Sequence, residues 1–232
     1  MDITARDKLI VALDVPSYDE ARDLVIRLGD TVTFYKIGLE LLFSGGLSLA
    51  QELTNEGKRV FLDLKFLDIG NTVERAVANA AQIGVDFLTV HGTDSKTLKA
   101  AVKGKDGAPL KLFAVTVLTS LDQADLTEQG IDATPAELVL KRARLAQANG
   151  FDGVIASGQE AASVRAATGP GFLITTPGIR LPGGDAGDQK RITTPEGALR
   201  DGANHLVVGR PITAAADPRK AALTFLDHIA AA

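Results

Sequence analysis

The residues best suited to chemistry in this chain are charged side chains within residues 61–73, FLDLKFLDIGNTV. Asp63 and Lys65 are two positions apart in an aliphatic run typical of a β-strand, so both side chains are expected on one face. Asp68 follows three residues later, beyond the expected strand end. Carboxylates on either side of an ammonium group keep it protonated and oriented, which suits it to acid catalysis or charge stabilisation. An ion-pair network that only closes the rim of the fold is the alternative interpretation of this spacing.

A second group of candidates surrounds a glycine-rich segment at 177–191, PGIRLPGGDAGDQKR. Arg180 and Gln189 lie on either side of its paired glycines, and Gly209 and Arg210 follow the last aliphatic run. Backbone N–H groups in glycine-rich loops, together with an arginine, are typical ligands of a phosphate group. The composition therefore predicts a phosphate-binding region, although a solvated surface loop would have a similar composition.

The elements that would position these residues follow one repeating pattern, in which short aliphatic runs alternate with amphipathic stretches. The aliphatic runs are 9–15, 33–39, 59–65, 86–92, 110–118, 153–157, 172–176 and 205–209. The helical stretches are 17–28, 44–56, 72–83, 95–103, 135–149, 159–168, 195–201 and 217–230. Runs without strict alternation of polar and apolar residues are typical of parallel strands buried on both faces.

Eight strands that alternate with eight helices predict a single-domain (β/α)8 TIM barrel, an α/β fold, over residues 1–232. A doubly wound open sheet is the alternative architecture. It is disfavoured because the first strand, LIVALDVPS, is not followed by the glycine-rich phosphate turn of a dinucleotide-binding fold.

The barrel also predicts where chemistry should occur, because active sites of this fold lie at the carboxyl ends of the strands. Polar residues do end the expected strands: Asp14 the first, Lys36 the second, Asp63 and Lys65 the third, Thr119 the fifth and Arg210 the eighth. Their joint position at one end predicts a single site.

Composition excludes several classes of protein. The chain is 45% hydrophobic and 23% charged, with a net charge of −4, which argues against disorder. The sequence contains no cysteine and therefore no disulfide or thiolate site. An acidic chain without basic clusters is a poor nucleic-acid binder, and no apolar run approaches the roughly 18 residues of a membrane span. The first residues do not resemble a secretory signal, so we expect a cytoplasmic protein.

The motifs themselves resemble a known family. Asp63, Lys65 and Asp68, followed by Ile69, Asn71 and Thr72, form D-x-K-x-x-D-I-x-N-T, which resembles the signature of orotidine 5'-monophosphate decarboxylases. The similarity continues through VALDV with Asp14, YKIG with Lys36, VTVLTS with Thr119, TPGIR with Arg180 and VVGRPIT with Gly209 and Arg210. Leu67 and Gly70 depart from the histidine and proline that are common in the signature, but neither position carries a charge.

The resemblance implies a homodimeric barrel that removes CO2 from orotidine monophosphate to give UMP in pyrimidine nucleotide synthesis, without metal or organic cofactor. It implies a catalytic charge network of Lys36, Asp63, Lys65 and Asp68. Lys65 would stabilise and then protonate the carbanion at C6 of the pyrimidine. Asp68, Ile69 and Thr72 would reach the site of the partner subunit.

The resemblance also implies how the substrate is held. Asp14 and Lys36 would bind the ribose hydroxyls and Thr119 the pyrimidine. Gln189 and Arg210, with backbone groups, would bind the phosphate. Arg180 and Gly209 complete the implied substrate-binding set.

Three alternative functions are compatible with parts of the sequence. A related barrel decarboxylase that acts on a sugar phosphate such as 3-keto-gulonate 6-phosphate shares D-x-K-x-x-D but resembles a Mg²⁺ enzyme, with glutamate where Lys36 stands. An ammonium group repels Mg²⁺, so Lys36 argues against it. A barrel that only binds nucleotide phosphates would not need Lys65 as a proton donor. A hexulose-phosphate aldolase is a remote third alternative.

Overall fold

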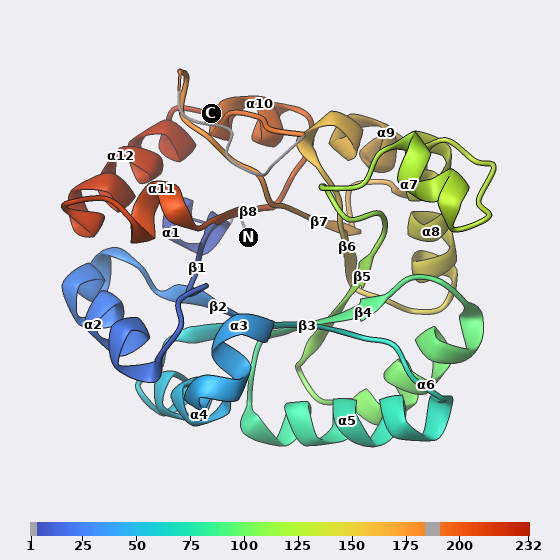
Figure 1. Ribbon diagram of the computed structural model, residues 1–232, viewed down its shortest axis with the longest axis horizontal. Coiled ribbons are helices and arrows are strands. Elements are labelled where there is room, and N and C mark those ends of the chain that lie inside the picture. Colours follow the sequence, from blue (N-terminus) through green and yellow to red (C-terminus); the bar gives the residue numbers. More distant parts are fainter. Residues whose placement is uncertain (1–3, 184–190) are drawn as a thin grey trace.

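Eight parallel strands form a closed barrel, and the computed structural model describes residues 4–183 and 191–232 of it (Figure 1). The strands are β1 (Leu9–Ala12), β2 (Phe34–Gly38), β3 (Arg59–Phe66), β4 (Phe87–His91), β5 (Lys111–Val115), β6 (Gly153–Ile155), β7 (Leu173–Thr176) and β8 (His205–Val208). Each strand pairs with its neighbours in sequence, and β1 pairs with β8 to close the sheet. The predicted (β/α)8 barrel is confirmed.

Helices surround the strands on the outside of the barrel (Figure 1). They are α1 (Ala5–Lys8), α2 (Tyr18–Leu28), α3 (Leu39–Leu41), α4 (Leu47–Asn55), α5 (Gly70–Ile83), α6 (Ser95–Lys105), α7 (Gln123–Glu128), α8 (Pro135–Ala148), α9 (Gly158–Thr168), α10 (Pro195–Arg200), α11 (Arg210–Thr213) and α12 (Pro218–Ala230). Two short turns, η1 (Gly29–Thr31) and η2 (Leu42–Gly46), complete the elements. The short helices α1, α3, α7 and α11 were not predicted, since they are too short to show a helical repeat.

Local sequence signals explain where the long helices begin. The side chains of Ser17, Asp94, Thr134 and Asp217 each accept a backbone N–H of the helix that follows. Such caps replace hydrogen bonds that the first turn of a helix cannot make internally. Proline occupies the first turn of α8, α10 and α12, where its missing N–H costs nothing.

The strand side chains alternate between two hydrophobic regions. Outward-facing residues such as Tyr35 pack with the helices in the main core. Inward-facing residues form a smaller cluster of Ile10, Ala12, Phe34, Phe61, Phe87, Phe113 and Val207. The ring centroids of Phe87 and Phe113 are 4.5 Å apart, so aromatic rings fill this part of the barrel interior. A filled interior is typical of eight-stranded barrels, and here a cavity lies above the rings.

The amino-terminal end of the barrel is closed by Arg59 at the start of β3. Its guanidinium lies 4.0 Å from the ring centroid of Phe34. Its Nε donates a hydrogen bond of 2.9 Å to Asp86, and a second guanidinium nitrogen lies 3.7 Å from Asp7 of α1. The charge is therefore compensated on one side by carboxylates and on the other by an aromatic face.

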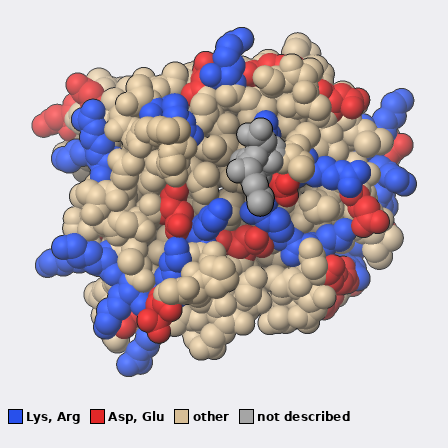
Figure 2. Space-filling view, turned by 180° about the vertical axis from the view of Figure 1, so that it is seen from behind, with Lys and Arg blue, Asp and Glu red and all other residues tan. Residues whose placement is uncertain are grey.

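Charged side chains of both signs are mixed on the face of the molecule that Figure 2 shows. Figure 2, the view from behind Figure 1, shows Lys and Arg mixed with Asp and Glu, without an extended patch of one sign on that face. Within residues 4–183 and 191–232, no helix is long and apolar enough to cross a membrane.

Candidate active site

A cavity of about 570 Å³ opens at the carboxyl ends of the strands, directly above the inner ring cluster. Its walls come from β1, β2, β3, β5, β6 and β8, from the segments that follow these strands, and from the loop after β7. Eight of the residues predicted for the site line it: Asp14, Lys36, Asp63, Lys65, Thr119, Arg180, Gly209 and Arg210. Residues distant in sequence therefore meet at one end of the barrel, as its topology requires.

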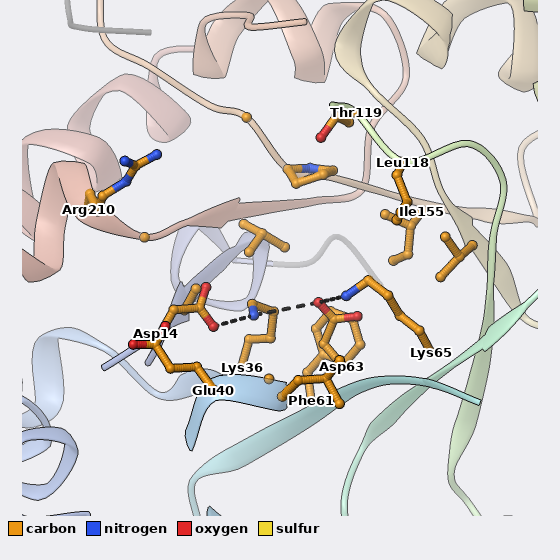
Figure 3. Close-up of a pocket in the computed structure, with 18 of the residues that line it drawn as sticks. Asp14, Lys36, Glu40, Phe61, Asp63, Lys65, Leu118, Thr119, Ile155 and Arg210 are labelled. Atoms are coloured by element: carbon orange, nitrogen blue, oxygen red, sulfur yellow. Dashed lines mark hydrogen bonds and ion pairs between the residues drawn. The ribbon is translucent and has the colours of Figure 1, made fainter. Parts of the chain in front are cut away.

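Four of these residues form a row of alternating charges across the cavity (Figure 3). Lys36 Nζ lies 2.8 Å from Asp14 Oδ1 and 3.5 Å from Asp63 Oδ2. Lys65 Nζ lies 2.9 Å from the same Asp63 oxygen. Asp63 thus bridges the two ammonium groups, and each buried charge faces a charge of opposite sign.

The two central residues of the row, Lys36 and Asp63, stay charged in spite of burial. Lys36 is only 7% exposed, and burial acts to lower its pKa, but attraction to Asp63 and Asp14 outweighs burial and the pKa is raised. For Asp63, burial acts to raise the pKa, but Lys36 and Lys65 outweigh it and the pKa is lowered. Both groups are therefore ionised at neutral pH.

Lys65 reaches the cavity through an irregularity in β3. The pairing of β3 with β4 shifts register between Leu62 and Phe66, and the backbone φ of Lys65 is +52°. A positive φ is uncommon for a residue with a Cβ. Asp63 and Lys65 do share the inner side, as predicted, but a strand bulge places them there rather than simple alternation.

Asp68, Ile69 and Thr72 lie apart from the cavity of their own chain. All three are exposed, Ile69 to 73%. Asp68 Oδ1 accepts the N–H of Ile69 at 2.6 Å, a bond within the loop after β3. The structure therefore places these three residues on the rim, outside the row of charges.

Residues predicted to bind a phosphate group also line the cavity. Pro177 and Gly178 follow β7, and Arg180, 8% exposed, lines the wall while its Nη1 donates to the carbonyl of Ile179 at 2.9 Å. Arg210 lines the same cavity from the start of α11, just after β8. Gln189, which was also predicted, lies outside the described residues.

Several residues that line the cavity were not predicted from the sequence. Glu40 lines it beside Asp14, and Phe61, Val115, Val117, Leu118 and Ile155 supply apolar wall (Figure 3). Gly38 also belongs to it: a Cβ there would lie 2.9 Å from Asp14 Oδ1 and 3.0 Å from Lys36 Nζ. The period-two alternation from Lys36 to Gly38 was the available signal, since it places both on the inner face.

Comparison with known proteins identifies a family for the chain as a whole. The family model described as "Orotidine 5'-phosphate decarboxylase / HUMPS family" matches residues 7–225. An orotidine 5'-phosphate decarboxylase of Methylobacterium sp. (strain 4-46) is 54% identical and covers 99% of this chain and 98% of its own. One from Afipia carboxidovorans is 54% identical, over 98% of this chain and 96% of its own.

Solved structures show the same similarity. The crystal structure of orotidine 5'-phosphate decarboxylase from Lactobacillus acidophilus superimposes with a TM-score of 0.86 at 37% identity, covering 95% of this chain and 98% of that one. An uncharacterised conserved protein from Geobacillus kaustophilus gives a TM-score of 0.83 at 34% identity, over 95% of this chain and 99% of that one. The motif resemblance is thereby confirmed, and the chain belongs to the orotidine 5'-phosphate decarboxylase / HUMPS family.

Proposed function

We propose that this protein decarboxylates orotidine 5'-monophosphate to UMP and CO2, a reaction of pyrimidine nucleotide synthesis. The observation that carries the proposal is the row Asp14–Lys36–Asp63–Lys65, which holds an ammonium group in a cavity large enough for a nucleotide. Relatives at 54% identity over nearly the whole chain bear the name of this activity, which supports the assignment.

Lys65 would provide the main catalytic effect. When the bond from C6 to the carboxylate breaks, its electron pair stays on C6, where the ring offers little resonance stabilisation. A fixed ammonium beside C6 stabilises this developing charge, most strongly where water is excluded. Lys65 then transfers a proton to C6 as general acid, and solvent reprotonates its amine. Asp63, 2.9 Å from Lys65 Nζ, keeps the ammonium oriented.

Asp63 would also lie near the carboxylate of the substrate. Two like charges about 4 Å apart repel by roughly 4 kcal/mol at an effective dielectric constant near 20. Enzymes lower activation barriers by about 8–23 kcal/mol, so repulsion alone accounts for a minor part of a large acceleration. Stabilisation of the carbanion by Lys65 must contribute more.

The remaining predicted residues would hold the substrate. Asp14 and Lys36 would bind the ribose hydroxyls, and Thr119 the pyrimidine. The apolar wall around Ile155 offers a surface for one face of the ring. The phosphate would lie on the opposite side. The groups that would bind it are the guanidinium groups of Arg210 and Arg180, the backbone at Gly209 and the side-chain amide of Gln189.

We also propose a homodimer in which Asp68, Ile69 and Thr72 complete the partner's cavity. Large apolar side chains gather at the rim after β2 and β3: Leu39, Phe43, Leu47, Leu67 and Ile69, exposed by 51%, 89%, 46%, 55% and 73%. β2 and β3 are adjacent strands, so the two segments flank the cavity mouth together. Exposed apolar surface of this kind marks interaction sites.

The cytoplasmic location stays a prediction.

The sugar-phosphate decarboxylase is the second candidate, because it shares the D-x-K-x-x-D motif formed here by Asp63, Lys65 and Asp68. Lys36 disfavours it. Its Nζ lies within 3.5 Å of carboxylates on both sides, where a positive charge opposes entry of Mg²⁺.

One experiment tests the proposal and separates the candidates. The purified protein is incubated with orotidine monophosphate while the ultraviolet absorbance of the pyrimidine is followed, with and without EDTA. We expect turnover that EDTA does not reduce, no turnover by Lys65→Ala, and measurable UMP binding by that variant. Absence of turnover, or near-normal turnover by Lys65→Ala, would contradict the proposal. Strict dependence on Mg²⁺ would favour the sugar-phosphate enzyme.

A further inference from the structure

Thr89, in the middle of β4, is hydrogen-bonded to two neighbouring residues of the charge row, Asp63 and Lys65. Its side chain is fully buried, with 0% exposure, and it is not among the residues that line the cavity. Its Oγ1 accepts the backbone N–H of Lys65 at 3.0 Å and donates to Asp63 Oδ1 at 2.9 Å. One hydroxyl group therefore contacts both residues and has its donor and one acceptor position in use.

We propose that Thr89 is a positioning residue for the decarboxylation, whose hydroxyl sets the relative placement of the Lys65 ammonium and the Asp63 carboxylate. The inference rests on the proposed function, in which both groups act on the substrate. Thr89 itself touches neither the cavity nor the substrate region, and acts through the two residues that do.

The strand bulge in β3 places the Thr89 hydroxyl where the pairing with β4 is interrupted. β3 pairs with β4 at Leu62↔Leu88 and next at Phe66↔Val90, so four steps on β3 (62 to 66) match two on β4 (88 to 90). The regular ladder is interrupted over the residues between, where Lys65 lies. Its N–H is bonded instead by the Thr89 side chain, which lies between the two paired positions. The hydroxyl thus takes the place of a ladder bond at the point where the strand departs from regular geometry.

The backbone of Lys65 adopts an unusual conformation beside the Thr89 hydroxyl. Its φ of +52° lies in the left-handed region, which a residue with a Cβ adopts only when surrounding contacts hold it there. The hydrogen bond to Thr89 is such a contact, directly at the strained residue. This backbone conformation determines where the Lys65 side chain begins, and hence whether its Nζ reaches Asp63.

The two carboxylate oxygens of Asp63 have different partners. Oδ1 accepts from Thr89, whereas Oδ2 faces the ammonium groups of Lys36 and Lys65. Rotation of the carboxylate would break the bond to Thr89 and the contacts with both lysines together. The hydroxyl therefore fixes which oxygen is presented to the reacting ammonium, and pre-organisation of this kind acts on the chemical step rather than on binding.

Three substitutions test the role of the hydroxyl. Thr89→Val keeps the shape of the side chain and removes the hydroxyl, and Thr89→Ser keeps the hydroxyl. Thr175→Val is the matched control: Thr175 on β7 is also 0% exposed, and its Oγ1 has no hydrogen-bond partner within the described part of the chain. For each variant, kcat and KM for orotidine monophosphate, the Kd for UMP and the pH dependence of kcat are measured.

We expect kcat of Thr89→Val to fall by about 100-fold, with KM and the Kd for UMP changed by less than about threefold. The acidic limb of the kcat profile should move to higher pH, because Asp63 loses a hydrogen bond to its charged form. Thr89→Ser should recover kcat to within about threefold of wild type, and Thr175→Val should match wild type throughout.

A Thr89→Val enzyme with kcat within threefold of wild type would overturn the proposal. So would a Thr89→Ser enzyme as impaired as Thr89→Val, or a loss of UMP affinity equal to the loss of kcat. Should Thr89→Val fail to fold, Thr89→Ala compared with Thr89→Ser decides by the same criteria. Wild-type protein that does not consume orotidine monophosphate would refute the proposed function and this role with it. An active wild type with an unimpaired Thr89→Val refutes this role alone.

Discussion

His205, at the start of β8, should lower the free energy of unfolding as the pH falls. The substitution His205→Leu should remove this pH-dependent loss of stability. The side chain is 3% exposed and lies edge-on to Phe87, with ring centroids 5.0 Å apart. Burial lowers the pKa of His205 to about 3, helped by the positive charges of Arg59 and Lys111 and opposed by Asp7. The imidazole therefore stays neutral in the folded protein at pH values where it is protonated in the unfolded chain.

The sign and size of the effect follow from linkage. Between pH 6.5 and about 3 the unfolded chain binds a proton at His205 that the folded protein does not, so the free energy of unfolding falls as pH falls. The full shift, 6.5 minus about 3, corresponds to about 5 kcal/mol at 1.36 kcal/mol per unit. Between pH 7 and pH 5, this residue should cost about 2 kcal/mol of stability.

The assay is urea unfolding of wild type and His205→Leu at pH 7 and pH 5 at constant ionic strength. Leucine changes the packing equally at both pH values, so the difference between the proteins should shift by about 2 kcal/mol in favour of the variant at pH 5. Thr175→Val, at the position paired with His205 across β7 and β8, is the control and should show a pH-independent difference. A difference between wild type and His205→Leu that is equal at both pH values would refute the reasoning.

Three further predictions concern the active site. Arg210→Ala should weaken both affinity and turnover, since binding of the remote phosphate helps to fix the ring, and unchanged kinetics would remove the phosphate assignment. Gly38→Ala would place a Cβ 2.9 Å from Asp14 Oδ1 and should weaken UMP binding about tenfold or more in a calorimetric titration; equal affinity would show that the ion pair tolerates displacement. Mixing inactive Lys65→Ala and Asp68→Ala proteins should restore activity through one intact cavity per heterodimer, and no recovery despite subunit exchange would contradict a shared site.

The barrel and most of its site could be predicted because they depend on local patterns. Aliphatic runs identified all the strands, and residues such as Asp14 and Lys36 were assigned to one mouth because parallel strands all end on the same side. Capping residues such as Ser17 marked where helices begin. These signals require only neighbours along the chain and a fixed strand direction.

Other features were not predictable, since they depend on contacts between distant segments. Arg59 packs on Phe34 of a neighbouring strand, and the Thr89 hydroxyl of β4 donates to Asp63 of β3. Gly38 of β2 leaves the space that Asp14, in the segment after β1, occupies. The short helices α1, α3, α7 and α11 carry no measurable period of their own.

The sequence by itself therefore determined the order of strands and helices and the charged residues available at one end of the barrel. Only the tertiary structure decided how those charges meet. Lys65 reaches Asp63 from a left-handed backbone conformation at a strand bulge, which period-two alternation does not encode. The physical reason is that alternation is a property of one strand, whereas the bulge depends on how β3 pairs with β4 and on a hydroxyl that β4 supplies.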